Sequence, residues 1–202
     1  MSSISGLIAP GLCAACGKGL FLSGSALCPG CSAALELFGD PRCRKCGRSV
    51  PKGAAPVCGN CASVRKGVSF LLPCGPYRGV LREAVLALKL RGFTALSEDL
   101  SSLMAAVVER DGRCLSGWVL VPVPLSPLSW RNRGYNHAAL LARGTARKTG
   151  LPVLSGALRK TRETARQSEL SRLYRLRNVR RAFEADEAVR GENVLLVDDV
   201  VT

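Results

Sequence analysis

Four C-x-x-C pairs near the start of the chain are its clearest chemical signal. Each pair begins fifteen residues after the one before, so the pairs form an internal repeat. Two cysteines separated by two residues can present both sulfurs to one ion from a tight turn, and two such turns complete a tetrahedral shell. A fourfold repeat is far more specific than one C-x-x-C, and it predicts two structural zinc ions rather than free buried cysteines. The eight predicted ligands are Cys13, Cys16, Cys28, Cys31, Cys43, Cys46, Cys58 and Cys61.

The spacing leaves open which pairs share an ion. Adjacent pairing, first with second and third with fourth, closes shorter loops, and a nested arrangement is the alternative. A closed four-sulfur shell has no position for a substrate, so we expect the ions to support folding and catalysis to take place elsewhere. Cys74 and Cys114 have no partner at ligand spacing, and they are interpreted as small apolar fillers.

A second candidate for chemistry is the acid pair Asp198 and Asp199, which follows the apolar run VLLV at residues 194–197. Charged side chains at the end of a buried strand are costly unless they face a ligand or a metal ion. Carboxylates suit two targets there, neighbouring sugar hydroxyls and a water-held Mg²⁺ that accompanies a diphosphate. The alternative is that the pair only caps a following helix.

Basic residues supply a complementary charge. The formal net charge is +14, and residues 131–181 hold fourteen Lys and Arg against two acids, a local balance of +12. Such a field attracts phosphate, on nucleic acid, on a metabolite or on anionic lipid, although a solvated basic face gives the same pattern. Arg131 and Arg133 stand beside Gly134 in what reads as a strand-to-helix loop. Guanidinium groups and free helix-start amides there would suit a phosphate, and an ordinary polar connection is the alternative.

The elements that must position these residues follow an α/β pattern from about residue 70. Hydrophobic periodicity predicts helices over 78–92, 96–110 and 137–150, a buried strand over 118–125, and a last buried strand before Asp198. In the first helix, Arg82, Lys89 and Arg91 lie outside the apolar stripe.

Two further segments have less regular patterns. Lys160 to Gln167 lacks an apolar period and is predicted to be a mobile loop that closes over a polyphosphate. Leu170, Leu173 and Leu176 recur at intervals of three and predict a short helix. His137, the only histidine, has no acid beside it in the sequence, and it is interpreted as a helix N-terminal residue rather than a catalytic base.

The compartment is predicted from the cysteines and from the apolar runs. No Lys/Arg-headed apolar signal peptide precedes the cysteines, which favours the reducing cytoplasm and thiolate ligation over disulfides. No apolar run approaches the ~20 residues that a membrane-spanning helix needs, so no integral membrane segment is expected.

The order of these motifs resembles the ComF family, the double-zinc-ribbon and phosphoribosyltransferase proteins linked to competence and DNA uptake. After the cysteine pairs come YRGVLREAVLALKLRG, VPVPLSPLSWRNRGYN, TRETARQSELSRLYRLRNVRRAF and VLLVDDVVT, so the resemblance covers essentially the whole chain. It implies an α/β fold class, with a small N-terminal double zinc ribbon over residues 1–65. A type I phosphoribosyltransferase-like domain with a mostly parallel sheet would occupy 70–202, with its C-terminal part missing.

The resemblance also implies roles for single residues. Asp198 and Asp199 would be the catalytic acids that contact the ribose hydroxyls of phosphoribosyl pyrophosphate, bound with Mg²⁺. His137 stands where the family usually has Gln. The family's phosphate loop continues through another Thr and a Gly, so we expect residues 1–202 alone to bind this ligand weakly or not at all. The implied substrate-binding residues are Arg131, Arg133, Gly134, Tyr135, Asn136, Arg162, Thr164, Gln167, Val200, Val201 and Thr202.

Two functions of different classes fit these observations. The first is an enzyme or former enzyme that binds phosphoribosyl pyrophosphate, with or without transfer of the phosphoribosyl group to an acceptor that the sequence does not identify. The second is a non-catalytic protein of DNA uptake, which binds single-stranded DNA or bridges it to a competence helicase through backbone phosphate contacts.

Overall fold

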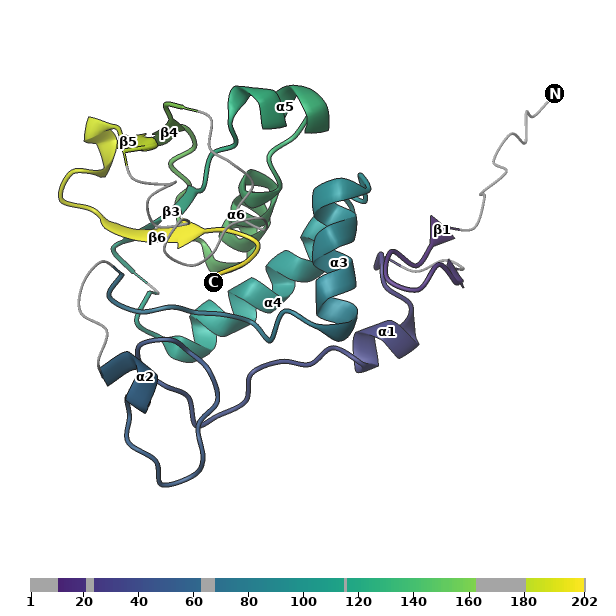
Figure 1. The fold of residues 1–202 in the computed structure, drawn as a ribbon, viewed down its shortest axis with the longest axis horizontal. Coiled ribbons are helices and arrows are strands. Elements are labelled where there is room, and N and C mark those ends of the chain that lie inside the picture. Colours follow the sequence, from purple (N-terminus) through teal and green to yellow (C-terminus); the bar gives the residue numbers. More distant parts are fainter. Residues whose placement is uncertain (1–10, 21–23, 63–67, 115, 163–180, 202) are drawn as a thin grey trace.

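The computed structural model describes residues 11–20, 24–62, 68–114, 116–162 and 181–201 (Figure 1). The helix predicted around Leu170 to Leu176 and most of the predicted 160–167 loop lie outside these residues. The described elements are β1 (Gly11–Leu12), β2 (Gly19–Leu20), α1 (Pro29–Ala33), α2 (Gly59–Ala62), α3 (Gly79–Leu90), α4 (Leu96–Asp111), β3 (Trp118–Pro122), α5 (Pro127–Arg133), α6 (His137–Thr149), β4 (Leu158–Lys160), β5 (Phe183–Ala185), the 3₁₀ helix Glu187–Val189 and β6 (Asn193–Val197).

The helices α3 and α4 confirm the sequence prediction closely. Leu81, Ala84 and Leu88 of α3 are buried, as their helical spacing predicts. The helix α4 ends where Gly112 adopts a left-handed conformation with φ 71°, which a residue without Cβ adopts at little cost. Within the described ranges, the helices are all too short or too polar to cross a membrane.

A pair of parallel strands, β3 and β6, carries the acid pair at one end. Trp118 pairs with Asn193 and Pro122 with Val197, so the two strands end side by side. A parallel bridge joins Leu120 to Val153, whereas β4 and β5 form a separate antiparallel pair. The described part is therefore a mixed arrangement of helices and small sheets that includes a parallel pair.

The two strands differ in burial. Apart from Trp118, every residue of β3 is buried, as its apolar run predicts. In β6 only Val197 is buried, and Leu196 is 54% exposed. The prediction that the acids end a buried strand is thus wrong for most of β6. An apolar run records the residue types in a strand but not how many neighbours cover its two faces.

The connection between β3 and α6 also differs from the prediction. Residues 127–133 form the helix α5, so Arg131 and Arg133 lie in its last turn and not in a loop. The Ser126 side chain caps this helix by accepting from the Ser129 N–H, and Pro127 occupies its first position. Gly134 ends it with φ 75°. The Ser-Pro start and the glycine stop were the sequence signals for this short helix.

The helix α6 packs against α4 and against both strands of the parallel pair. Gly144 permits the close approach to α4, because a Cβ at this position would lie 2.3 Å from Oγ of Ser101. Ser101 is fully buried at this contact. The packing fixes the position of α6, and its first residue, His137, lies at the end of the parallel strands that bears the acids.

The cysteine-rich segment, described over residues 11–20 and 24–62, contacts the rest of the chain at both ends of α4 (Figure 1). In the first turn of α4, Asp99 Oδ2 accepts the Ala26 N–H at 2.9 Å. Just beyond the other end, Arg113 donates to the Arg44 carbonyl at 3.2 Å. Cys13, Ala14 and Leu27 also belong to the same apolar core as α3. The N-terminal segment is therefore docked on the helices by hydrogen bonds and apolar packing.

Candidate functional site

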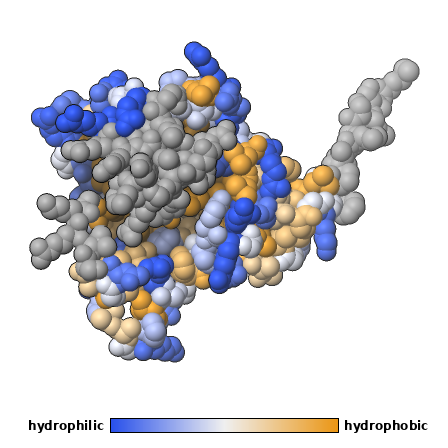
Figure 2. Space-filling model, viewed as in Figure 1, coloured by the Kyte–Doolittle hydropathy of each residue, from blue (hydrophilic) through white to orange (hydrophobic). Residues whose placement is uncertain are grey.

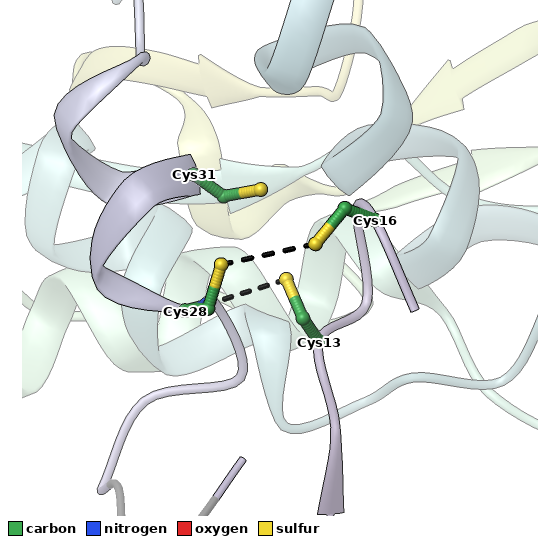
Figure 3. A group of neighbouring side chains, drawn as sticks. All are labelled: Cys13, Cys16, Cys28 and Cys31. Atoms are coloured by element: carbon green, nitrogen blue, oxygen red, sulfur yellow. Dashed lines mark hydrogen bonds between the residues drawn. The ribbon is translucent and has the colours of Figure 1, made fainter. Parts of the chain in front are cut away.

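The first candidate metal centre is formed by Cys13, Cys16, Cys28 and Cys31 (Figure 3). Their sulfurs lie within 4.8 Å of one another, and the Cys16 and Cys28 sulfurs are 3.8 Å apart. Four sulfurs at ~2.3 Å from a tetrahedral zinc ion are ~3.8 Å from each other, so the separation fits zinc. The Cys28 N–H donates to Sγ of Cys13 at 3.3 Å, a bond that stabilises thiolate charge.

The second centre repeats the first. Cys43, Cys46, Cys58 and Cys61 gather within the same 4.8 Å limit, with 3.9 Å between the sulfurs of Cys46 and Cys58. The Cys58 N–H donates to Sγ of Cys43, again at 3.3 Å. The pairing is therefore adjacent, first pair with second and third with fourth. The alternative nested arrangement is excluded.

The protonation of the thiols differs within each group. Burial would raise the pKa of Cys13, but N–H groups of Cys28, Cys16 and Ala15 that point at its sulfur lower it to about 6. Burial and the neighbouring sulfurs raise the pKa of Cys31 to about 12. Cys43 and Cys61 show the same contrast, at about 6 and about 12. Zinc would thus find Cys13 and Cys43 largely as thiolates and would have to displace a proton from Cys31 and from Cys61.

The acid pair lies in a cluster of ionisable side chains drawn from four parts of the chain. Asp199 follows β6, and its Oδ2 lies 2.6 Å from Nζ of Lys89 on α3. The same oxygen is 3.6 Å from Nε2 of His137 at the start of α6. On the other side of the ring, Nη1 of Arg133 on α5 lies 2.8 Å from Nδ1 of His137. Arg133 and Asp199 are thereby linked through one imidazole ring, whose side chain is only 4% exposed.

The two acids have opposite electrostatic environments. Burial alone would raise the pKa of Asp199, but His137 and Lys89 outweigh it and hold that pKa well below the usual range. For Asp198, desolvation and the adjacent Asp199 charge raise the pKa to about 6. Asp198 as a residue is nevertheless exposed, so water reaches its carboxyl group and screens part of this effect. Asp199 is the permanent anion, and Asp198 is the acid with access to solvent.

His137, Asp198 and Asp199 also form a third group that meets the distance criterion for holding a metal ion. Its surroundings differ from those of the sulfur groups, because cationic side chains already face its ligand atoms. The Lys89 ammonium group lies on Oδ2 of Asp199, and the Arg133 guanidinium group lies on Nδ1 of His137. A resident ion held by all three residues therefore does not fit this charge distribution.

Two neighbouring residues with predicted substrate roles make internal hydrogen bonds. The Tyr135 hydroxyl donates to the Leu88 carbonyl of α3. The Asn136 side chain donates to the Val123 carbonyl at 3.0 Å and accepts from the N–H groups of Ala138 and Ala139. The expectation of free amides at the start of α6 is thus wrong for those two groups, because the Asn136 side chain caps them.

Five of the other predicted substrate residues belong to the described part of the chain. Gly134 ends α5, and Arg131, on the same helix, is exposed. Val200 packs against the core, whereas Val201 is 62% exposed. Arg162 is exposed, at the end of the described part of its segment. Thr164, Gln167 and Thr202 lie outside the described residues.

Sequence reasoning missed two members of the cluster. Lys89 was placed outside the apolar stripe and given no role, but it reaches an acid 110 positions along the chain. His137 was set aside because no acid stood near it in the sequence. Helical spacing shows that Lys89 is off the apolar stripe, but it cannot show which distant group faces it. The available signals were the single histidine at a helix start and a lysine in an otherwise apolar turn.

Comparisons with known proteins found one matching domain family and several similar proteins. Residues 4–62 match the family described as the double zinc ribbon domain. The DNA utilization protein YhgH of Salmonella typhi is 40% identical over 84 residues, which are 41% of this chain and 37% of that protein. The protein of the same name from Escherichia coli K12 is 39% identical over 83 residues, with the same shares. The chain thus spans little more than a third of these relatives. No solved structure matches.

Proposed function

We propose that this chain binds phosphoribosyl pyrophosphate together with Mg²⁺ at the carboxyl end of β6, and that it acts in the use of DNA as a ComF-type protein. In this proposal residues 1–65 are the zinc-bound ribbons of a cytoplasmic protein, and 70–202 belong to a phosphoribosyltransferase-like domain. The observation that carries the proposal is the gathering of Asp198, Asp199, Lys89, His137 and Arg133 beside the ends of two parallel strands. The printed names of the relatives support the connection with DNA.

The charges suggest a division of tasks between the acids. Asp199 is engaged by Lys89, so Asp198 is the better candidate to accept hydrogen bonds from ribose hydroxyls. An exposed carboxylate also suits a water-held Mg²⁺ that bridges a diphosphate. Lys89 and Arg133 bring positive charge to the same edge. Pyrophosphate leaves such a sugar from an oxocarbenium-like centre, so positioning and charge neutralisation would supply most of the catalysis.

A titration that follows the imidazole of His137 by NMR tests this proposal, because the chain has one histidine and its signals need no assignment. Phosphoribosyl pyrophosphate with Mg²⁺ should shift these signals with a Kd of about 1 mM or weaker in residues 1–202. Asp198→Asn should abolish the shift. Asp186→Asn is the matched control, since Asp186 caps the 3₁₀ helix and pairs with Arg159 at 3.9 Å rather than with a residue of this cluster. An unchanged spectrum of the wild-type chain at saturating ligand would contradict the proposal.

A second candidate function is binding of single-stranded DNA, alone or as a bridge to a helicase. The excess of fourteen basic residues over two acids between 131 and 181 favours it. Figure 2 shows hydrophilic surface over β4 and β5, and Arg159 of β4 is exposed. Phosphate contacts alone would give affinity that is independent of sequence and falls steeply with salt.

Fluorescence anisotropy with labelled oligo-dT tests this second function. Each arginine that contacts a phosphate should lower the salt slope by about 1 when it is replaced. We expect this of Arg159→Ala, whereas Asp198→Asn should leave DNA affinity unchanged or slightly higher. Affinity that does not depend on salt would exclude the second function.

A further inference from the structure

His137 is the buried junction between a cation and an anion. His137 is the first residue of α6. One of its ring nitrogens faces α5, and the other faces the loop after β6. Nδ1 lies 2.8 Å from the Arg133 guanidinium group, and Nε2 lies 3.6 Å from the Asp199 carboxylate. A histidine in this position can be a general base, a metal ligand or a spacer that orients its neighbours, and the contacts discriminate between these roles.

The Arg133 contact fixes the proton on the ring. A guanidinium group only donates hydrogen bonds, so Nδ1 at 2.8 Å must be an acceptor without a proton. A neutral ring then carries its proton on Nε2, the nitrogen that faces Asp199. This Nε2–H tautomer presents an acceptor to the cation and a donor to the anion. A metal ion on Nε2 would require the opposite tautomer, and a base would need a free lone pair there.

The Lys89 contact completes the arrangement on the side of Asp199. Its ammonium group and the His137 ring address the same carboxylate oxygen, Oδ2. The Asp199 N–H in turn donates to Oδ1 of Asp198 at 2.8 Å. The orientation of the exposed acid is therefore connected to the buried ring through a single residue.

We propose that His137 is a positioning residue, locked by Arg133 in the Nε2–H tautomer, which orients Asp199 against Lys89 and thereby sets the direction of Asp198. The proposal deepens the proposed function and rests on it for the identity of the ligand that Asp198 contacts. The locked tautomer and its dependence on Arg133 do not require any ligand.

The donor and acceptor pattern identifies the substitution that preserves the role. A glutamine side chain also offers an oxygen that accepts and an amide that donates, so His137→Gln can satisfy Arg133 and Asp199 together. His137→Leu has similar bulk and offers neither group. A role limited to filling space would be served at least as well by leucine.

The first experiment is a long-range ¹H–¹⁵N correlation spectrum of the zinc-loaded chain at pH 7.5. We expect the single imidazole to show the Nε2–H tautomer, and Arg133→Met to produce a mixture of tautomers. Arg131→Met, on the same helix but exposed, should leave the tautomer unchanged. A third equivalent of Zn²⁺ should leave the ring signals in place. A dominant Nδ1–H form, a pattern unaffected by Arg133→Met, or a zinc-induced shift of Nε2 would overturn the proposal.

The second experiment measures ligand affinity, with phosphoribosyl pyrophosphate and Mg²⁺, by calorimetry or tryptophan fluorescence. His137→Gln should retain affinity within about threefold, and His137→Leu should lose about tenfold, as for other residues that orient a binding group. Equal affinity in both variants would overturn the positioning role. If the wild-type chain does not bind, the proposed function fails, and the tautomer spectra with Arg133→Met and Asp199→Asn still decide whether the ring is locked between these residues.

Discussion

Nζ of Lys89 lies 2.6 Å from Oδ2 of Asp199, although the two residues are 110 positions apart in the chain. The contact joins α3 to the loop after β6. The Asp199 side chain is 5% exposed and that of Lys89 is 34% exposed. The acid is thus buried with a cation that still reaches water.

Loss of the Lys89 charge should destabilise the fold. Lys89→Met leaves Asp199 buried with a weaker set of partners, and we expect the free energy of unfolding to fall by about 1–3 kcal/mol after discounting for the exposure of Lys89. Urea denaturation of the zinc-loaded chain measures the change. Arg190→Met is the control, because its pair with Glu187 is exposed on both sides and should contribute less than about 0.5 kcal/mol. Equal effects of the two substitutions would show that the Lys89–Asp199 pair stabilises the fold no more than an exposed ion pair does.

The raised pKa of Asp198 predicts how the free energy of unfolding changes with pH. Its pKa is about 6 in the folded chain, above the ~3.9 of an unfolded aspartate, so the folded state binds the extra proton between these values. Its contribution to stability therefore falls as the pH rises from about 4 to about 6. The stability difference between Asp198→Asn and wild type should shift in favour of the variant by about 1 kcal/mol from pH 5 to pH 7, allowing for solvent screening. Taking the difference cancels the pH dependence of zinc binding, and a constant difference would refute the raised pKa.

Metal content should follow the two sulfur groups. We expect two zinc ions per purified chain, and one after Cys13→Ser or Cys43→Ser, as measured by elemental analysis. Cys74→Ser should retain both ions, since Cys74 belongs to neither group. Loss of both ions from a single ligand substitution would indicate that the two centres do not fold independently. Fewer than one ion in the wild-type chain would count against zinc altogether.

The close contact of α4 with α6 predicts an unusual cost for alanine. In an exposed helix, Gly to Ala is expected to stabilise by about 0.5–1 kcal/mol. Gly144→Ala should instead destabilise by about 1–3 kcal/mol, because the new methyl group would meet Ser101 at 2.3 Å. Thermal unfolding of the zinc-loaded chain measures the effect. Ser101→Gly carries a cost of its own, but in that background Gly144→Ala should lose most of its destabilising effect, and an unchanged effect would mean that the clash lies elsewhere.

The sequence predicted those parts of the fold that depend on short-range patterns. The extent of α4, its end at Gly112 and the extent of α6 follow from apolar spacing and from stop signals within a few residues. The repeat of C-x-x-C pairs likewise identified all eight sulfurs that gather in two groups. These features are local because one turn or one helix determines each of them.

The charged cluster could be predicted only in part, because it is made by long-range contacts. Asp198 and Asp199 were recognised by their position after a strand, and Arg133 by its charge. Lys89 and His137 were not, since their partners come from other elements. The single histidine at a helix start and the lysine in an otherwise apolar turn did not show which residues would lie beside them. The local helix α5 was missed for a different reason, because its seven residues are too few to show a clear period.

The two ends of α4 give the zinc ions an influence beyond their own shells. Asp99 is hydrogen-bonded to Ala26 in the segment of the first sulfur group, and Arg113 is hydrogen-bonded to Arg44 in the segment of the second. Between them, Ser101 of α4 packs against Gly144 of α6. An ion that binds only the folded ribbon stabilises everything cooperatively attached to it, by mass action. Chelation should therefore loosen the position of the His137 ring, although His137 belongs to neither described sulfur group. The free zinc concentration should then also affect how firmly Asp198 and Asp199 are held.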